Sequence, residues 1–174
     1  QEIFGAAGLG IFPDPVFAKT LRDAYEELGG SYPRPEGDVH LDNFYPAYDF
    51  MSAGGEGLTF VLHEIGHALG LKHTDDDGGN GRPTFAALGL SGLDNYSYTL
   101  MSPGSLGTGG FAEGNPATPM LLDILAIQRI YGANPTTNSG DTTYSLQADG
   151  ALRAIWDVGG TDVFDASGND SFGI

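Results

Sequence analysis

Apolar residues recur three or four positions apart in three stretches of the 174-residue chain, 14–29, 57–69 and 119–131. This spacing matches the roughly 3.6 residues of an α-helical turn, so each stretch predicts a helix with an apolar face. The middle stretch is apolar on most sides, and we expect its helix to be buried in the core. The last stretch follows Thr118 and Pro119, a typical N-cap and first-turn pair, which predicts that its helix begins at residue 119.

Short strands are predicted where apolar and polar residues alternate. Residues 38–42 read Asp-Val-His-Leu-Asp, a pattern typical of a half-buried strand. Nearer the C-terminus, segments 143–146, 154–158 and 163–165 are rich in β-branched and aromatic residues and are separated by Gly/Asp turns. Residues 74–92 are acidic and glycine-rich, so we expect an irregular loop there.

These elements indicate an α+β fold, and the length suits one domain with a core that buries about 70% of the unfolded surface. Cysteine is absent, which excludes disulfides and thiolate ligands and leaves imidazole and oxygen for any metal site. The formal charge is -16, from 23 acidic and 7 basic residues, which argues against binding nucleic acid or an anionic membrane. No apolar run reaches about 18 residues, so no membrane insertion is expected.

The candidate chemistry lies at the end of the middle helix. On a helix, His63 and His67 lie on one face and can present two imidazole nitrogens to one metal ion. Gly70 stands where a helix can end in the left-handed conformation, and a turn there returns His73 toward the same ion. Catalytic zinc uses about three protein ligands and keeps one position open, and Glu64 is left as a general base for its water.

Residues 63–73 follow H-E-x-x-H-x-x-G-x-x-H, the metzincin form of the zinc-protease motif. The alternatives are a buried helix with ordinary core or surface histidines, or a metal site without activity. The chain has 4 histidines and three of them occupy ligand positions, which favours the metal site. The remaining one, His40, lies in the predicted strand 38–42, and we interpret it as a strand surface residue rather than a second metal site.

A methionine follows the third histidine of the motif after some 30 residues, the spacing of the Met-turn beneath a metzincin zinc ion. Alone, Met101 would be interpreted as a core methionine, because its flexible side chain fills irregular gaps. Together with the zinc motif, it predicts a Met-turn.

Three stretches of the chain resemble the serralysins, secreted bacterial zinc proteases of the metzincin clan with a C-terminal calcium-binding RTX β-roll. They are the zinc motif, residues 119–142 and residues 155–165, and the likeness is dense from about Leu58 to Ser167. The resemblance implies a metzincin-like domain with a small twisted sheet, an active-site helix and a C-terminal helix. It places this domain at residues 1–136, with a short or incomplete N-terminal part, and the junction with a truncated β-roll at 137–174.

The resemblance also implies the roles of individual residues. His63, His67 and His73 are the expected zinc ligands, Glu64 the catalytic base and Met101 the Met-turn residue. A structural calcium ion is expected at the junction, held by about six to eight oxygens. Its expected ligands come from two turns: Asn138, Gly140 and Thr142 from the first, and Asp157, Gly159 and Asp162 from the second.

The expected function is zinc-dependent hydrolysis of peptide bonds in protein or peptide substrates. The protein is expected to be secreted, and a proteinaceous inhibitor is expected as a further partner. The alternative is a calcium-stabilised binding or assembly module on the same scaffold with little or no turnover, and a non-proteolytic metal hydrolase is a third hypothesis.

Two residues depart from the family pattern. Pro103 replaces a zinc-proximal tyrosine and Thr74 a proline, so we expect the rate, the metal geometry or the cleft wall to differ.

Overall fold

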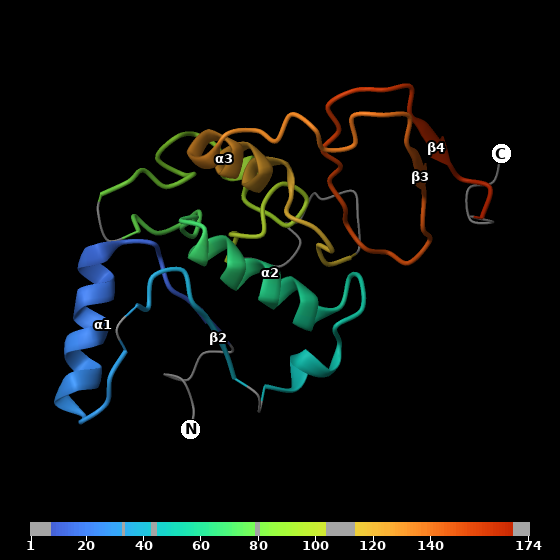
Figure 1. The fold of residues 1–174 in the computed structure, drawn as a ribbon. Helices are drawn as coiled ribbons and strands as arrows, with labels where there is room; N and C mark the ends of the chain where they lie inside the picture. Colours follow the sequence, from blue (N-terminus) through green and yellow to red (C-terminus); the bar gives the residue numbers. More distant parts are fainter. Residues whose placement is uncertain (1–7, 33, 43–44, 79–80, 104–113, 169–174) are drawn as a thin grey trace.

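The computed structural model describes residues 8–32, 34–42, 45–78, 81–103 and 114–168. These ranges contain three α-helices, two short 3-10 helices and four short strands, arranged as Figure 1 shows. None of the helices in the described ranges is long and apolar enough to cross a membrane.

Helix α2, Glu56–Ala68, crosses the middle of the molecule and confirms the helix expected over 57–69 (Figure 1). The expectation that its apolar side chains are buried is wrong in detail, because Ile65 is 39% exposed. The buried positions of α2 instead carry small or polar residues: Gly57, Thr59, Gly66 and His67. Neighbouring segments approach the helix closely at these positions, so its packing depends on glycines as well as on apolar bulk.

A two-stranded antiparallel sheet lies along one side of α2. It pairs β1, Gly8–Gly10, with β2, Val39–Leu41, and Leu9 stands opposite His40. Strand β2 confirms a strand within 38–42, but not the predicted alternation of burial, because the apolar Leu41 is 39% exposed. Strand β1 was not predicted, because two of its three residues are glycines, which are depleted in strands. His40 lies on β2 and is hydrogen-bonded to the Tyr32 hydroxyl.

Helix α1, Pro15–Glu27, confirms the first predicted helix and lies beside the sheet (Figure 1). Asp14 accepts the amide hydrogen of Val16 through its side chain, as expected of an N-terminal residue. Ala18 is fully buried, but Val16 is 74% exposed and Leu28 is 87% exposed. The described part of the chain therefore covers only part of the apolar face of α1.

Helix α3, Leu121–Tyr131, lies on the side of α2 away from the sheet (Figure 1). The prediction that it begins after Thr118 is wrong by two residues, since Met120 is the N-cap. Thr118 instead accepts the amide hydrogen of Ala154 at 2.9 Å, so it serves the C-terminal segment. The helix ends before Gly132, as predicted, with a φ of 87° at that glycine.

The hydrophobic core lies between α2 and α3. Three buried residues, Leu71, Leu100 and Met101, form its centre. Leu62 of α2 and two residues of α3 pack against them. The core therefore joins the zinc motif, the predicted Met-turn and the C-terminal helix in one unit.

The connections agree with the predicted irregular segments. The 3-10 helix η1, Pro46–Asp49, leads toward α2. The described residues within 74–92 are turns, bends and irregular segments, except that the short 3-10 helix η2, Ser91–Leu93, begins at the end of this range.

The C-terminal segment extends to the side of the molecule opposite α1 (Figure 1). Its strands β3, Thr143–Ser145, and β4, Val163–Asp165, pair in parallel and confirm two of the three predicted strands. Residues 154–158 form no strand, because their backbone is hydrogen-bonded to loop residues instead. For example, Trp156 O accepts a hydrogen bond from the side-chain amide of Asn138 at 3.1 Å. The boundary near residue 136 stays a prediction.

Candidate metal centre

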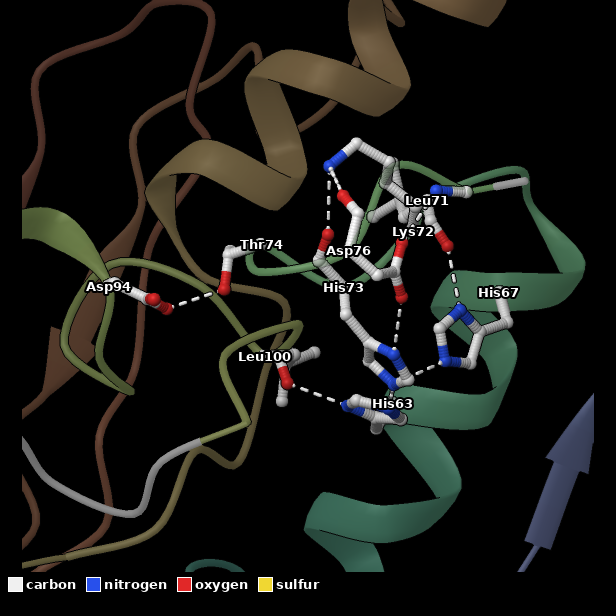
Figure 2. Close-up of polar contacts among 10 residues, drawn as sticks. His63, His67, Leu71, Lys72, His73, Thr74, Asp76, Asp94 and Leu100 are labelled. Atoms are coloured by element: carbon white, nitrogen blue, oxygen red, sulfur yellow. Dashed lines mark hydrogen bonds and ion pairs between the residues drawn. The ribbon is translucent and has the colours of Figure 1, made fainter. Parts of the chain in front are cut away.

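Three histidine rings converge at the C-terminal end of α2 and the loop that follows it, as Figure 2 shows. The Nε2 atom of His73 lies 3.1 Å from that of His63 and 3.0 Å from that of His67. Nitrogens bound to one tetrahedral zinc ion at about 2.0–2.1 Å lie roughly 3.3 Å apart. The three rings are therefore spaced as ligands of a single metal ion would be.

The opposite nitrogen of each ring faces an oxygen. Nδ1 of His63 lies 2.7 Å from Leu100 O, Nδ1 of His67 2.7 Å from Leu71 O, and Nδ1 of His73 2.8 Å from Asp76 Oδ2 (Figure 2). A carbonyl or carboxylate oxygen only accepts hydrogen bonds, so each Nδ1 carries the proton. Each Nε2 then points its lone pair into the shared space, in the tautomer that metal-binding histidines adopt.

The rings on α2 are kept neutral by burial. Burial lowers the pKa of His67 to about 4, although the Leu71 carbonyl acts in the opposite direction. Burial also lowers the pKa of His63, against the effect of the Leu100 carbonyl. A neutral imidazole is the form that binds metal, so these two rings need not lose a proton near pH 7.

The turn at Gly70 brings His73 to the other two rings. Gly70 has a φ of 96°, its amide donates to His67 O at 2.8 Å, and the Leu71 amide donates to Gly66 O at 2.9 Å. These two bonds form a Schellman motif, which reverses the chain at a helix C-terminus. The predicted left-handed end of the helix is confirmed.

Glu64 follows the first histidine and is held by strand β1. Its Oε2 accepts the amide hydrogen of Gly10 at 2.5 Å. Burial raises the pKa of Glu64, while the Gly10 bond and the neighbouring His73 lower it. A Cβ atom added to Gly10 would lie 2.1 Å from Glu64 O and 2.7 Å from His67 Cβ, so only glycine fits there. We did not predict this role for Gly10, whose only signal was a short alternation of glycine and apolar residues.

Met101 lies directly against the zinc-motif helix. It is 3% exposed and lies in a turn, and its sulfur would be 2.7 Å from a Cβ atom added to Gly66. Gly66 precedes His67, so the turn packs against the helix between its two histidines. The Met-turn role of Met101 stays a prediction.

No family model matches the chain. Curated relatives do match: serralysin C of Dickeya chrysanthemi is 40% identical over 136 residues, covering 69% of this chain and 28% of that protein. Serralysin of Proteus mirabilis is 35% identical over 143 residues, covering 73% of this chain and 29% of the relative. Metallopeptidase AprA of Pseudomonas marginalis is 38% identical over 132 residues, covering 64% of this chain and 28% of that relative.

The chain is a serralysin homologue. It spans less than a third of the length of these relatives. The homology extends the fold assignment to a metzincin-like protease domain, with which the helices and small sheets are compatible. It also implies a metal cofactor, and the cluster His63, His67 and His73 is available to hold one.

Thr74 is one of the positions where this serralysin homologue departs from the pattern noted above. It is 3% exposed, its amide donates to Met101 O at 3.1 Å, and its hydroxyl donates to Asp94 at 2.5 Å (Figure 2). A proline has no amide hydrogen and no hydroxyl, so it could form neither bond. In this chain, the residue after His73 is therefore tied to the turn of Met101.

The two turns expected to hold calcium lie side by side in this chain. The Thr142 amide donates to Asp162 Oδ1 at 3.0 Å, and a Cβ atom added to Gly160 would lie 2.5 Å from Gly140 O. The Asp157 carboxylate accepts from the Gly159 amide at 2.8 Å and from the Tyr144 hydroxyl at 2.5 Å. Asn138 has a positive φ of 50°. The structure thus brings both turns together, and several of their oxygens accept protein hydrogen bonds.

Asp123 is a further residue near the centre whose role sequence reasoning missed. It is 2% exposed, and it accepts hydrogen bonds from the Thr99 hydroxyl at 2.6 Å and from the amides of Leu100 and Met120 at 2.8 Å each. Burial raises its pKa, against the lowering effect of these three donors. The available signal was an acidic residue in the first turn of a largely apolar helix.

Proposed function

We propose that the chain binds a zinc ion through His63, His67 and His73 and hydrolyses peptide bonds in protein substrates. The observation that carries the proposal is the convergence of three Nε2 atoms whose rings each donate Nδ1–H to an oxygen. When bound, zinc polarises a carbonyl and lowers the pKa of a water molecule toward about 7. The protease names of the homologues support peptide bonds as the target and give no support to the binding-module alternative.

Glu64 is the proposed general base. It precedes the second histidine by three residues, and its carboxylate is held beside the cluster by the Gly10 amide. Burial raises its pKa, which increases its basicity, while the Gly10 amide limits the rise. In the proposed reaction, the carboxylate takes a proton from the attacking water and passes it to the leaving amine.

Pro103 gives the proposed site a different set of donors from the family pattern. It follows Met101 by two residues, where the serralysins have a tyrosine, and proline has no hydroxyl to donate. We therefore expect slower turnover than in an enzyme with that tyrosine.

A structural calcium ion between the turns 138–142 and 157–162 is part of the proposal, as is action outside the cell. The contact between the two turns supports the calcium site, because it brings the Gly140 carbonyl and the Asp162 carboxylate to the same junction, and calcium binds oxygens of both kinds. The Met-turn role of Met101 is supported by its contact with Gly66. The start of a β-roll at β3 and β4 stays a proposal, supported by their parallel pairing.

The test is cleavage of a mixed quenched-peptide library by the chain, by Glu64→Ala and by a matched control, Glu56→Ala. Glu56 lies in the first turn of the same helix and is exposed. Zinc occupancy is matched by metal analysis, and calcium is saturating.

We expect the parent and Glu56→Ala to cleave alike and to lose activity to a zinc chelator. Glu64→Ala should bind zinc as the parent does and be slower by about two orders of magnitude or more, because the base is gone while the ligands remain. If all three proteins bind zinc and none cleaves, the protease proposal is wrong for this chain.

A further inference from the structure

We infer that Asp123 is a positioning residue of the metal centre, which anchors the segment whose two successive backbone carbonyls, Leu100 O and Met101 O, hold both ends of the histidine motif. The inference rests on the proposed metal site, because these carbonyls accept hydrogen bonds from the proposed ligand His63 and from the residue after the proposed ligand His73. Asp123 itself does not contact the histidine rings in any interaction of the described residues. Its effect is transmitted through the segment 99–101.

The carboxylate fixes this segment from the α3 side. Oδ1 accepts the Thr99 hydroxyl at 2.6 Å, and Oδ2 accepts the Leu100 amide at 2.8 Å. The same Thr99 oxygen accepts the Met101 amide at 3.0 Å. Thr99 and Leu100 are therefore bonded to Asp123 directly, and Met101 is connected to it through the Thr99 hydroxyl. Oδ2 also accepts the Met120 amide at 2.8 Å, which joins the segment to the start of α3.

The same segment holds the zinc motif from its other side. Leu100 O accepts Nδ1–H of His63 at 2.7 Å, and Met101 O accepts the amide of Thr74, the residue after His73, at 3.1 Å. Through the Thr99 hydroxyl, the carboxylate fixes the Met101 amide, which shares a rigid peptide plane with Leu100 O and so restricts where that carbonyl can point. Met101 O is the next carbonyl of the same anchored segment. The first and third histidines are therefore positioned from one anchor.

Asp123 is buried, so its carboxylate interacts with protein donors rather than with solvent. A buried ionised group is costly unless it is fully hydrogen-bonded, and here three donors meet it. It also lies in the first turn of α3, where the helix dipole favours a negative charge. Removing it would leave those donors buried without their acceptor.

The test compares the zinc affinity of the chain with those of Asp123→Ala, Asp123→Asn and a control, Thr59→Val. Thr59 is also 2% exposed and on α2, but its hydroxyl bonds Gly55 O and Pro116 O, not the segment 99–101. Affinity is measured by chelator competition, the visible spectrum of the cobalt-substituted protein reports the ligand geometry, and thermal unfolding without metal reports stability.

We expect Asp123→Ala to lower zinc affinity about 10-fold or more and to change the cobalt spectrum, as loss of an outer contact does at other metal sites. Asp123→Asn should keep most of the affinity, because its amide oxygen can accept the two backbone amides while its NH2 group faces the Thr99 oxygen. Thr59→Val should lose stability and keep both the affinity and the spectrum.

A folded Asp123→Ala protein with the parent's affinity and spectrum would overturn the inference, as would an equal loss of affinity in Thr59→Val. If Asp123→Ala does not fold, Thr99→Val decides: it removes the hydroxyl link to Met101, so a lower affinity supports the inference and an unchanged one overturns it. If the unmodified chain binds no zinc, the proposed metal site itself is wrong, and the inference fails with it.

Discussion

At the scale of single residues, the geometry of the candidate centre depends on two glycines that allow close contact with α2. Gly10 of β1 lies against Glu64 and His67, and Gly66 of the helix lies against Met101. A methyl group at either position would approach its neighbours to 2.1 or 2.7 Å, well inside van der Waals contact. The positions of the Glu64 carboxylate and of the histidine rings therefore depend on the absence of side chains at these two glycines.

Gly10→Ala should destabilise the chain by about 2 kcal/mol or more, because the new methyl group collides with the backbone of α2. The displaced strand should also withdraw its amide from Glu64 and lower peptide cleavage. Gly92→Ala is the control, since nothing lies within 4 Å of its added Cβ atom. Urea unfolding gives the stabilities, and equal values for the two variants would contradict the predicted collision.

His67 makes the stability of the metal-free chain depend on pH. Its pKa is about 4 in the folded chain and 6.5 when unperturbed, because the ring is buried. Above pH 6.5 the ring is neutral in both states and has no effect. As the pH falls toward 4, the unfolded chain takes up a proton that the folded chain excludes, so stability falls by roughly 3 kcal/mol in total.

The measurement is urea unfolding of the metal-free parent and of His67→Gln between pH 7 and pH 4. The variant should lack this part of the pH dependence, because glutamine does not titrate. Parallel stability curves for the two proteins would show that His67 does not make this contribution.

At the scale of elements, α1 and α2 end in the same way but with different consequences. After α1, the Gly29 amide donates to Glu26 O at 2.9 Å and the Gly30 amide to Tyr25 O at 2.8 Å, which repeats the Schellman pattern at Gly70. Both glycines have a positive φ, 76° at Gly29 and 96° at Gly70. Only the turn at Gly70 is followed by a proposed metal ligand.

This pair allows a matched comparison of Gly29→Ala with Gly70→Ala. Each variant should lose about 1–2 kcal/mol of stability, because alanine in the left-handed region is strained. Neither added Cβ atom has a neighbour closer than 3.7 Å, so strain dominates in both. Only Gly70→Ala should weaken zinc binding, measured by chelator competition, because it also moves His73. A similar zinc affinity in both variants would contradict the role given to this turn.

At the scale of the whole molecule, the C-terminal segment is joined to the rest by a small number of described contacts. Leu152 pairs with Pro116, and Thr118 bonds Ala154, while β3 and β4 pair only with each other in the described chain. The formal charge of -16 is spread over a chain with many acidic turns, so self-repulsion opposes the compact state. A bound cation at this junction would reduce that repulsion and connect two turns.

Calcium should raise the melting temperature of the chain through the proposed site, by mass action worth about 2.7 kcal/mol at a hundred times the dissociation constant. Asp162→Asn should reduce this effect, whereas Glu27→Gln, which removes one charge from the end of α1, should not. Differential scanning calorimetry with calcium or magnesium checks this. An equal response of both variants, or of both ions, would indicate general charge screening instead.

Much of the secondary structure could be predicted because it depends on neighbours in sequence. The helices at 14–29 and 57–69 and the strand at 38–42 are confirmed as elements, although some of their apolar residues, such as Val16 and Leu41, are exposed. The predictions failed where another part of the chain decided the outcome. Residues 154–158 have a strand-like composition, but their backbone is bonded to loops, and α3 begins two residues late because Thr118 bonds Ala154.

The sequence by itself determined the spacing of the histidines, because His63, His67 and His73 are positioned by one helix turn and one Schellman turn within eleven residues of chain. The tertiary structure alone decided what orients His63 and Glu64, whereas His67 and His73 bond to oxygens only four and three residues away. Gly10 is 54 residues from Glu64, and Leu100 is 37 residues from His63. Helical spacing and left-handed turns are local properties of the backbone, whereas these hydrogen bonds form only when distant segments pack against α2.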